Sequence, residues 1–160
     1  MKTASPKWDQ PEYRRITCAE VQSNHVLVTF ADRTEARLET HQLAAGSDLD
    51  WRRMTFTPYE LIVPSGSGEV EVPWSSIRLL SDPEYSAHLA AAAEEEAHNI
   101  GKRLKELRKN RNLTAKELAQ RAGITPQSLS RIEHGHHDVV FTTLQRLLAA
   151  MGYTVRDLAT

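Results

Sequence analysis

Apolar and polar residues alternate along residues 14–80, which is the pattern of strands that bury one face. The alternation begins at residues 16–21. Two further apolar runs, at 26–30 and 36–38, flank residues 31–34, whose composition is typical of a hairpin turn.

The same pattern continues after the first hairpin. Short apolar runs occupy residues 54–56, 60–63 and 69–72, and the sequence PSGSG at 64–68 favours a tight turn between the last two. We therefore expect residues 14–80 to form a small β-rich domain.

Beyond Pro83 the apolar residues recur at helical spacing. Asp82 and Pro83 are suited to a helix start, and the following segment has strong helix formers and no proline. We expect a helix from about residue 83 to about residue 110, bent near residues 99–101. Its apolar positions are Tyr85, Leu89, Ala92, Ala93, Ile100, Leu104 and Leu107.

Two shorter amphipathic helices follow, separated by a three-residue turn. Thr114 precedes the first helix, and Thr125 with Pro126 opens the second. A threonine side chain at such a position caps free N–H groups, and the N–H that proline is missing would have no partner there. Gly123 is suited to the turn, and Gly135 to the end of the second helix. The spacing predicts a helix-turn-helix, which places one helix end in the DNA major groove.

Charge is divided unevenly, although the 160-residue chain has a formal net charge of −1. Residues 97–160 hold 11 Lys/Arg and 5 Asp/Glu, a balance of +6, whereas residues 1–96 hold 9 and 16, a balance of −7. This division indicates that only the C-terminal part binds a polyanion.

The single cysteine, Cys18, excludes an intramolecular disulfide and is typical of a reducing compartment. Its alternating neighbourhood predicts a small core residue. No apolar run resembles a signal peptide or is long enough for a membrane span, so we expect a cytoplasmic protein with no membrane partner.

These patterns predict an α+β protein: a small β-rich domain, a long connecting helix and an all-α helix-turn-helix domain. The expected divisions are a loosely ordered N-terminus at 1–13, the β-rich sensor or partner domain at 14–80, the connecting helix at 81–99 and the DNA-binding domain at 100–160.

Residues 100–158 resemble the Xre/Cro-type repressor helix-turn-helix family, which implies a five-helix all-α domain. The resemblance rests on LTAKELA at 113–119, GIT at 123–125, LSRIEHG at 129–135, TLQRLLAAMG at 143–152 and VRDL at 155–158. The family usually has a long polar residue where this chain has Pro126, and often glutamine where it has Ala115.

From its position in the helix-turn-helix, the first exposed turn of helix 125–134 enters the groove, which makes Gln127 a partner for adenine and Arg131 for guanine. The expected base contacts are Pro126, Gln127, Ser130 and Arg131. The expected phosphate contacts are Thr114, Lys116, Thr125, Ser128, His136 and His137. Arg108 and Glu133 resemble a family ion pair that ties the first helix to the third, and we assign that pair a structural role.

The cluster His134, His136, His137 and Asp138 admits three interpretations: a metal site, a loop near phosphates and a plain surface. No second ligand pair lies elsewhere in the sequence, so we favour the phosphate-proximal loop and expect no metal and no cofactor. Histidines near phosphates would bind DNA more strongly at mildly acid pH.

Helically spaced apolar residues near 140–151 are expected in the core, and any exposed remainder would form a homodimer contact, as in relatives. A two-fold dimer would place its recognition helices about 34 Å apart on an inverted-repeat operator of double-stranded DNA.

Residues 14–80 resemble a small bacterial domain of unknown function, on VLVTFAD at 26–32, YELIV at 59–63 and EVPW at 71–74. Such domains often accompany toxin-like partners, which implies a possible toxin or small ligand at this domain. His25 and His41 are isolated, and Trp51, Phe56 and Trp74 are expected to pack in the core rather than to line a pocket.

We therefore expect a dimeric, sequence-specific DNA-binding transcriptional regulator, a repressor, and not an enzyme. The alternative is an antitoxin that neutralises a toxin through its N-terminal domain and represses its own operon. A third hypothesis, an enzyme with a DNA-targeting appendage, would require a bound metal or cofactor.

Overall fold

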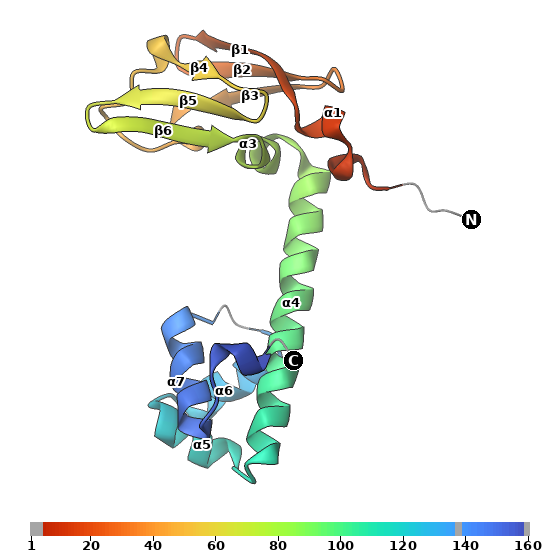
Figure 1. Cartoon of the computed structure of the whole chain (residues 1–160), viewed down its shortest axis with the longest axis vertical. Helices are drawn as coiled ribbons and strands as arrows, with labels where there is room; N and C mark the ends of the chain where they lie inside the picture. Colours follow the sequence, from red (N-terminus) through yellow and green to blue (C-terminus); the bar gives the residue numbers. More distant parts are fainter. Residues whose placement is uncertain (1–4, 137–138, 159–160) are drawn as a thin grey trace. The chain divides into compact units, whose positions relative to one another are not determined.

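The computed structural model describes residues 5–136 and 139–158. The chain divides into two compact units, Met1–His88 and Leu89–Thr160, and one helix, α4 (Pro83–Asn110), contributes residues to both. The described strands all belong to the first unit, and the helices that follow α4 belong to the second (Figure 1). The α+β class expected from the sequence is confirmed.

The first unit holds two antiparallel three-stranded sheets. One sheet has the order β1 (Ile16–Gln22), β2 (His25–Phe30), β3 (Glu35–Glu39), and the other the order β4 (Thr55–Phe56), β5 (Glu60–Ser65), β6 (Gly68–Pro73). Alternate residues of each sheet face a shared core, as the period-two pattern requires. Its buried members are Ile16, Val26, Val28, Phe30, Ala36, Leu38, Leu61, Val72 and Ile77.

Cys18 is not the core residue that the alternation predicted. A bulge in β1 makes Ile16 pair with Phe30 but Cys18 with Thr29, so the phase of the strand shifts by one residue. Cys18 is half-buried on the outer face, where its Sγ lies 3.8 Å from a carboxylate oxygen of Glu20. Ala19 takes the inward position instead.

Helical segments that the sequence did not predict lie at both ends of this unit. Loose order was expected over residues 1–13, but η1 (Lys7–Asp9) and α1 (Pro11–Arg14) form there. Helix α3 (Trp74–Ser81) follows β6 directly. The connection between β3 and β4 contains the short helical segments α2 (Thr40–Leu43) and η2 (Trp51–Arg53).

Arg78 of α3 is the most buried charged side chain of the first unit, with 3% of its surface exposed. Its guanidinium lies 3.8 Å from the ring centre of Tyr13 and 3.7 Å from that of Phe30. It donates hydrogen bonds to the Tyr13 carbonyl oxygen at 3.0 and 2.7 Å, to Thr34 Oγ1 at 2.7 Å and to Asp32 Oδ2 at 2.9 Å. All of its polar atoms are thus satisfied, which makes its burial tolerable.

Asp82, at the start of α4, ties the N-terminal segment to this unit. Tyr13 donates its hydroxyl to Asp82 Oδ2 at 2.8 Å, and Lys7 Nζ lies 3.0 Å from the same oxygen. Burial acts to raise the pKa of Asp82, but the hydrogen bonds from Lys7 and Tyr13 outweigh it and lower the pKa to about 2. The carboxylate is therefore ionised in the folded chain at any ordinary pH.

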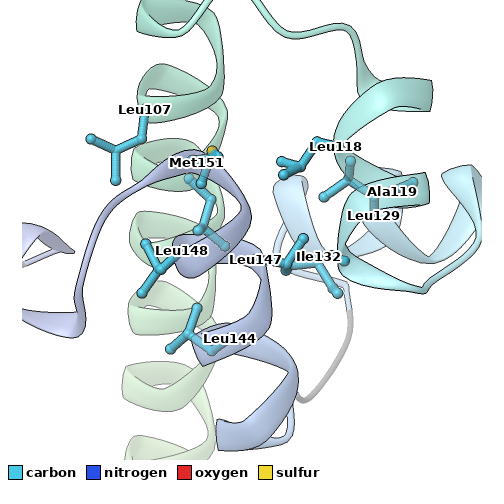
Figure 2. Packing of buried hydrophobic residues seen from close by; sticks show 11 residues of the cluster. Leu107, Leu118, Ala119, Leu129, Ile132, Leu144, Leu147, Leu148 and Met151 are labelled. Atoms are coloured by element: carbon cyan, nitrogen blue, oxygen red, sulfur yellow. The ribbon is translucent and has the colours of Figure 1, made fainter.

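The second unit packs the rest of α4 against α5 (Ala115–Ala122), α6 (Pro126–Glu133), α7 (Phe141–Met151) and the short 3₁₀ segment η3 (Val155–Leu158). Leucines from all four α-helices meet in one core (Figure 2). The buried residues are Leu104, Leu107, Leu118, Ala119, Ala122, Leu129, Ile132, Leu144, Leu147, Leu148 and Met151.

Two glycines let α4 approach the end of α6 closely. A Cβ on Gly101 would collide with the carbonyl oxygen of Ile132, and one on Gly135 would lie 2.7 Å from His98 Cα. Gly135 also has a φ of +71°, a conformation that other residues rarely adopt. Gly101 lies within the continuous helix α4, where the sequence predicted a bend.

Candidate nucleic-acid interface

The turn between α5 and α6 forms because its capping residues satisfy the free helix ends. Thr114 accepts a hydrogen bond from the Glu117 N–H, and the Glu117 carboxylate accepts one from the Thr114 N–H, a complete capping box. Gly123 ends α5 with a φ of +67°. Thr125 caps α6 by accepting from the Ser128 N–H, and Pro126 fills the first helical position. The helix boundaries predicted from these residues are confirmed.

Helix α6 has one buried and one exposed face. Leu129 and Ile132 pack in the core, and Glu133 is buried beside them. The four residues expected to contact bases, Pro126, Gln127, Ser130 and Arg131, are all exposed. Positions 127 and 131 are four residues apart, so their side chains project from the same side of the helix. An exposed glutamine and arginine one turn apart form a suitable surface for base edges.

The hydroxyl groups expected to contact phosphates are already engaged in caps. Thr114 Oγ1 donates to Glu117 Oε2 at 2.7 Å, and the Thr125 and Ser128 hydroxyl oxygens lie 2.8 Å apart. Hydrogen bonds from the Thr114 side chain and backbone lower the pKa of Glu117, so a carboxylate occupies the start of α5. That negative charge disfavours a phosphate at the same point.

Charged groups around the turn remain accessible. Lys116, expected to contact phosphate, is exposed on α5. Arg146 of α7 was not identified from the sequence, yet its Nη1 lies only 3.6 Å from where a Cβ on Gly123 would stand. It therefore adds a cation beside the turn. The sequence could have indicated Arg146 as a phosphate contact, because it lies at an exposed position of the predicted helix 143–152.

Arg108 and Glu133 form a bidentate ion pair. Arg108 Nε donates to Glu133 Oε1 at 2.7 Å and Nη2 to Oε2 at 2.8 Å, while Nη1 donates to the Leu113 carbonyl oxygen at 2.9 Å. The bond to Glu133 raises the pKa of Arg108 despite burial. The side chains are 11% and 4% exposed, so the pair links α4 to α6 inside the unit and not at its surface.

The histidines after α6 have separate surroundings. His134 Nδ1 donates to the Ser130 carbonyl oxygen at 2.6 Å and so caps the end of α6, and its ring stacks with that of His136 at 6.4 Å between centres. His136 is exposed, whereas His137 and Asp138 lie outside the described residues. Within residues 5–136 and 139–158, no group of three His, Cys, Asp or Glu side chains is arranged to hold a metal ion.

Comparison with known proteins identifies this part of the chain. The helix-turn-helix family model HTH_3 matches residues 104–158. Among solved structures, the restriction-modification controller protein C.AhdI from Aeromonas hydrophila is 26% identical, with 40% of this chain and 97% of that chain covered and a TM-score of 0.39.

The clp gene regulator ClgR from Corynebacterium glutamicum is 29% identical, with 39% of this chain and 80% of that chain covered and a TM-score of 0.38. No curated protein matches the chain significantly. In the described part of the chain, no helix combines the length and apolar composition needed to cross a bilayer.

The family match supports a DNA-binding regulator of transcription, and regulators with this domain are typically not enzymes. The geometry of α5 and α6 agrees with that assignment, because both helices carry the caps, turn and exposed face that the motif requires. Residues 104–158 are a helix-turn-helix domain of the Xre/Cro type.

Proposed function

We propose that the chain is a sequence-specific repressor of transcription that inserts the first turn of α6 into the major groove of an operator. One observation carries this proposal. Gln127 and Arg131 project into solvent from the same side of α6, while the opposite side of that helix is held rigidly in the core by Leu129 and Ile132. A rigid element that presents polar side chains is what base recognition needs.

Each exposed side chain has a suitable partner on DNA. Gln127 forms a bidentate pair with adenine and Arg131 with guanine, each contributing about 1–3 kcal/mol of discrimination. Ser130 accepts or donates to a base edge between them. Pro126 has no donor and contributes an apolar contact to a thymine methyl group. Recognition therefore depends mainly on positions 127 and 131.

Contacts to the DNA backbone come from the charged groups around the turn. Lys116 and Arg146 are exposed beside α5 and the turn, and His136 follows α6. The hydroxyls of Thr114, Thr125 and Ser128 are engaged in caps. They contact phosphates, and so help to fix the position of the protein on the DNA, only while also keeping those cap hydrogen bonds. Each phosphate neutralised by a cation adds about 0.9 to the salt slope of binding.

The operator is bound by a homodimer. Apolar residues near the start of α7 and in η3 support this part of the proposal, because Val140 is 67%, Phe141 57% and Val155 38% exposed. Contiguous exposed apolar side chains are typical of a surface that another subunit covers, and Val140 and Phe141 are adjacent in sequence. A two-fold dimer would require an inverted repeat with half-sites about 34 Å apart.

Selection of bound sites from random DNA duplexes tests the proposal. We expect a two-fold symmetric motif with half-sites about one helical turn apart, and binding that weakens steeply with salt. Recovery of no motif from the full-length protein would contradict sequence-specific recognition. A motif without symmetry would contradict the dimer while leaving recognition intact.

A further inference from the structure

The first sheet of the N-terminal unit has an open edge. Strand β1 is an outer strand, paired only with β2. The nearest strand of the second sheet, β4, has just two residues, Thr55 and Phe56, and does not pair with β1. On this outer side the Ile16 N–H donates to the Pro58 carbonyl oxygen, but no described strand is hydrogen-bonded to β1 from Ala19 onward.

The backbone groups at this edge follow from the register. Antiparallel strands alternate between residues that bond to the partner and residues that bond away from it. On β2, Phe30 donates to Thr34 on the β3 side, whereas Ala31 donates to Arg15 on the β1 side. By this alternation the residues of β1 opposite Val26 and Val28, namely Val21 and Ala19, point their N–H and C=O groups away from β2.

No partner meets these groups among the residues that the structure describes. Ala19 and Val21, two residues apart on the edge strand, both direct N–H and C=O groups outward and so form a template for one more strand.

A hollow of about 470 Å³ lies beside the edge. Ala19, Val21 and Ser23 form one wall, and Arg52 with Met54 forms the other. Ala19, Val21 and Met54 also pack against the core between the two sheets. It adjoins a second hollow of about 430 Å³, which includes Leu49 and Trp51.

Arg52 is the cation of this opening. It is exposed, and no carboxylate in the described part of the chain lies within ion-pair distance of it. Asp48 and Asp50 line the adjoining hollow together with Arg52, and Asp48 accepts a hydrogen bond from the Gly66 N–H. Hence the edge offers free backbone groups, a hollow that Ala19, Val21 and Met54 line together with Ser23 and Arg52, and an arginine with no ion-pair partner in the described part of the chain.

We propose that this edge binds an extended peptide segment of another protein, which adds to β1 as a fourth strand. Its backbone bonds to Ala19 and Val21, alternate apolar side chains enter the hollow, and an acidic side chain pairs with Arg52. Main-chain bonds supply affinity and the side-chain pocket supplies specificity in this mode of recognition. The site lies wholly in the first unit, so it is independent of the DNA-binding face.

Selection from a random heptapeptide library displayed on phage, against the full-length protein, tests the proposal. We expect peptides with apolar residues at alternate positions and an acidic residue at a constant offset. Addition of such a synthetic peptide should slow hydrogen exchange at the Ala19 and Val21 amides. The Glu20 and Gln22 amides, which face β2, should be slow already in the free protein. N-methylation of every second peptide residue should abolish binding when the methylated amides are those that bond to β1, and should leave binding intact when they are the amides that point away.

Arg52→Glu should weaken peptide binding about tenfold, the equivalent of one charged contact. Arg53→Glu is the matched control, since Arg53 is exposed next in sequence but does not line the hollow. Equal losses in both variants would overturn the charge argument. Recovery of no peptide, or unchanged exchange at Ala19 and Val21, would overturn the site. Exchange at these amides that slows with protein concentration alone would assign the edge to a second copy and refute a foreign peptide.

Discussion

Removing the charge of Glu133 should unfold the helix-turn-helix domain at a much lower temperature. Glu133→Gln keeps the size and one acceptor of the side chain but leaves the Arg108 guanidinium, 11% exposed, without its carboxylate. Breaking a buried ion pair from one side costs about 3–5 kcal/mol, because the remaining charge stays buried and unpaired. Arg108 keeps its bond to the Leu113 carbonyl oxygen, so we expect a loss near the lower limit, about 3 kcal/mol.

The position of the tryptophans separates the two units in a thermal melt. Trp8, Trp51 and Trp74 all lie in the first unit, so tryptophan fluorescence reports its unfolding alone. Far-UV circular dichroism reports mainly the helices of the second unit. For a domain of this size, about 3 kcal/mol lowers the midpoint by about 12–24 °C. The dichroism transition should shift by this amount and the fluorescence transition should not.

Glu106→Gln supplies the matched control, because Glu106 lies on the same helix as Arg108 and pairs with Arg103 at 3.5 Å on an exposed face. An exposed pair contributes at most about 1 kcal/mol. Equal shifts in the two variants would refute the reasoning. In the double variant Arg108→Met with Glu133→Leu, stability should largely return, since apolar residues of similar volume often replace a buried pair without loss.

Asp82→Asn should lower the free energy of unfolding by about 2 kcal/mol at pH 7, because the folded pKa of about 2 lies below the ordinary 3.8. In urea unfolding followed by tryptophan fluorescence, this difference in stability from the natural protein should disappear as the pH falls from about 4 to about 2. A difference that stays constant over this range would contradict the reasoning. Gly101→Ala should destabilise the second unit by about 1–3 kcal/mol in the dichroism melt, since the new methyl group meets the Ile132 carbonyl oxygen, and an unshifted midpoint would show that the helices have room. Arg131→Ala should relax base preference at one operator position, whereas Lys116→Ala should weaken all DNA about equally and lower the salt slope by about 1, both measured by fluorescence anisotropy on selected and random duplexes. An Arg131→Ala protein with unchanged affinity and preference would contradict the proposed docking of α6.

Much of the helix-turn-helix could be predicted because its signals are local. Thr114 and Glu117 cap a helix from three residues apart, and Gly123 ends it with a conformation that few other residues tolerate. The same holds for Thr125 and Pro126 at the next helix. The exposure of Gln127 and Arg131 followed from helical period alone, since Leu129 and Ile132 fix which side is buried. The contacts of these two side chains with DNA remain predictions.

The first unit was less predictable, because its decisive contacts join distant residues. Nothing near Arg78 indicates that Tyr13, 65 positions away, accepts its hydrogen bonds, or that two aromatic rings enclose it. The bulge that turns Cys18 outward depends on pairing with β2 and not on the residues of β1. Arg146 likewise reaches the α5–α6 turn only once α7 has packed.

The sequence by itself determined where the helices of the second unit begin and end, which of their faces are apolar and where positive charge is concentrated. These properties depend on residues close in sequence, within about one helical turn or about two strand residues. Only the tertiary structure decided that Arg146 lies beside the α5–α6 turn, that Arg108 and Glu133 are buried together, and that the edge of β1 is left without a paired strand beside Arg52. Each of these outcomes is a competition among groups that only packing brings within bonding distance.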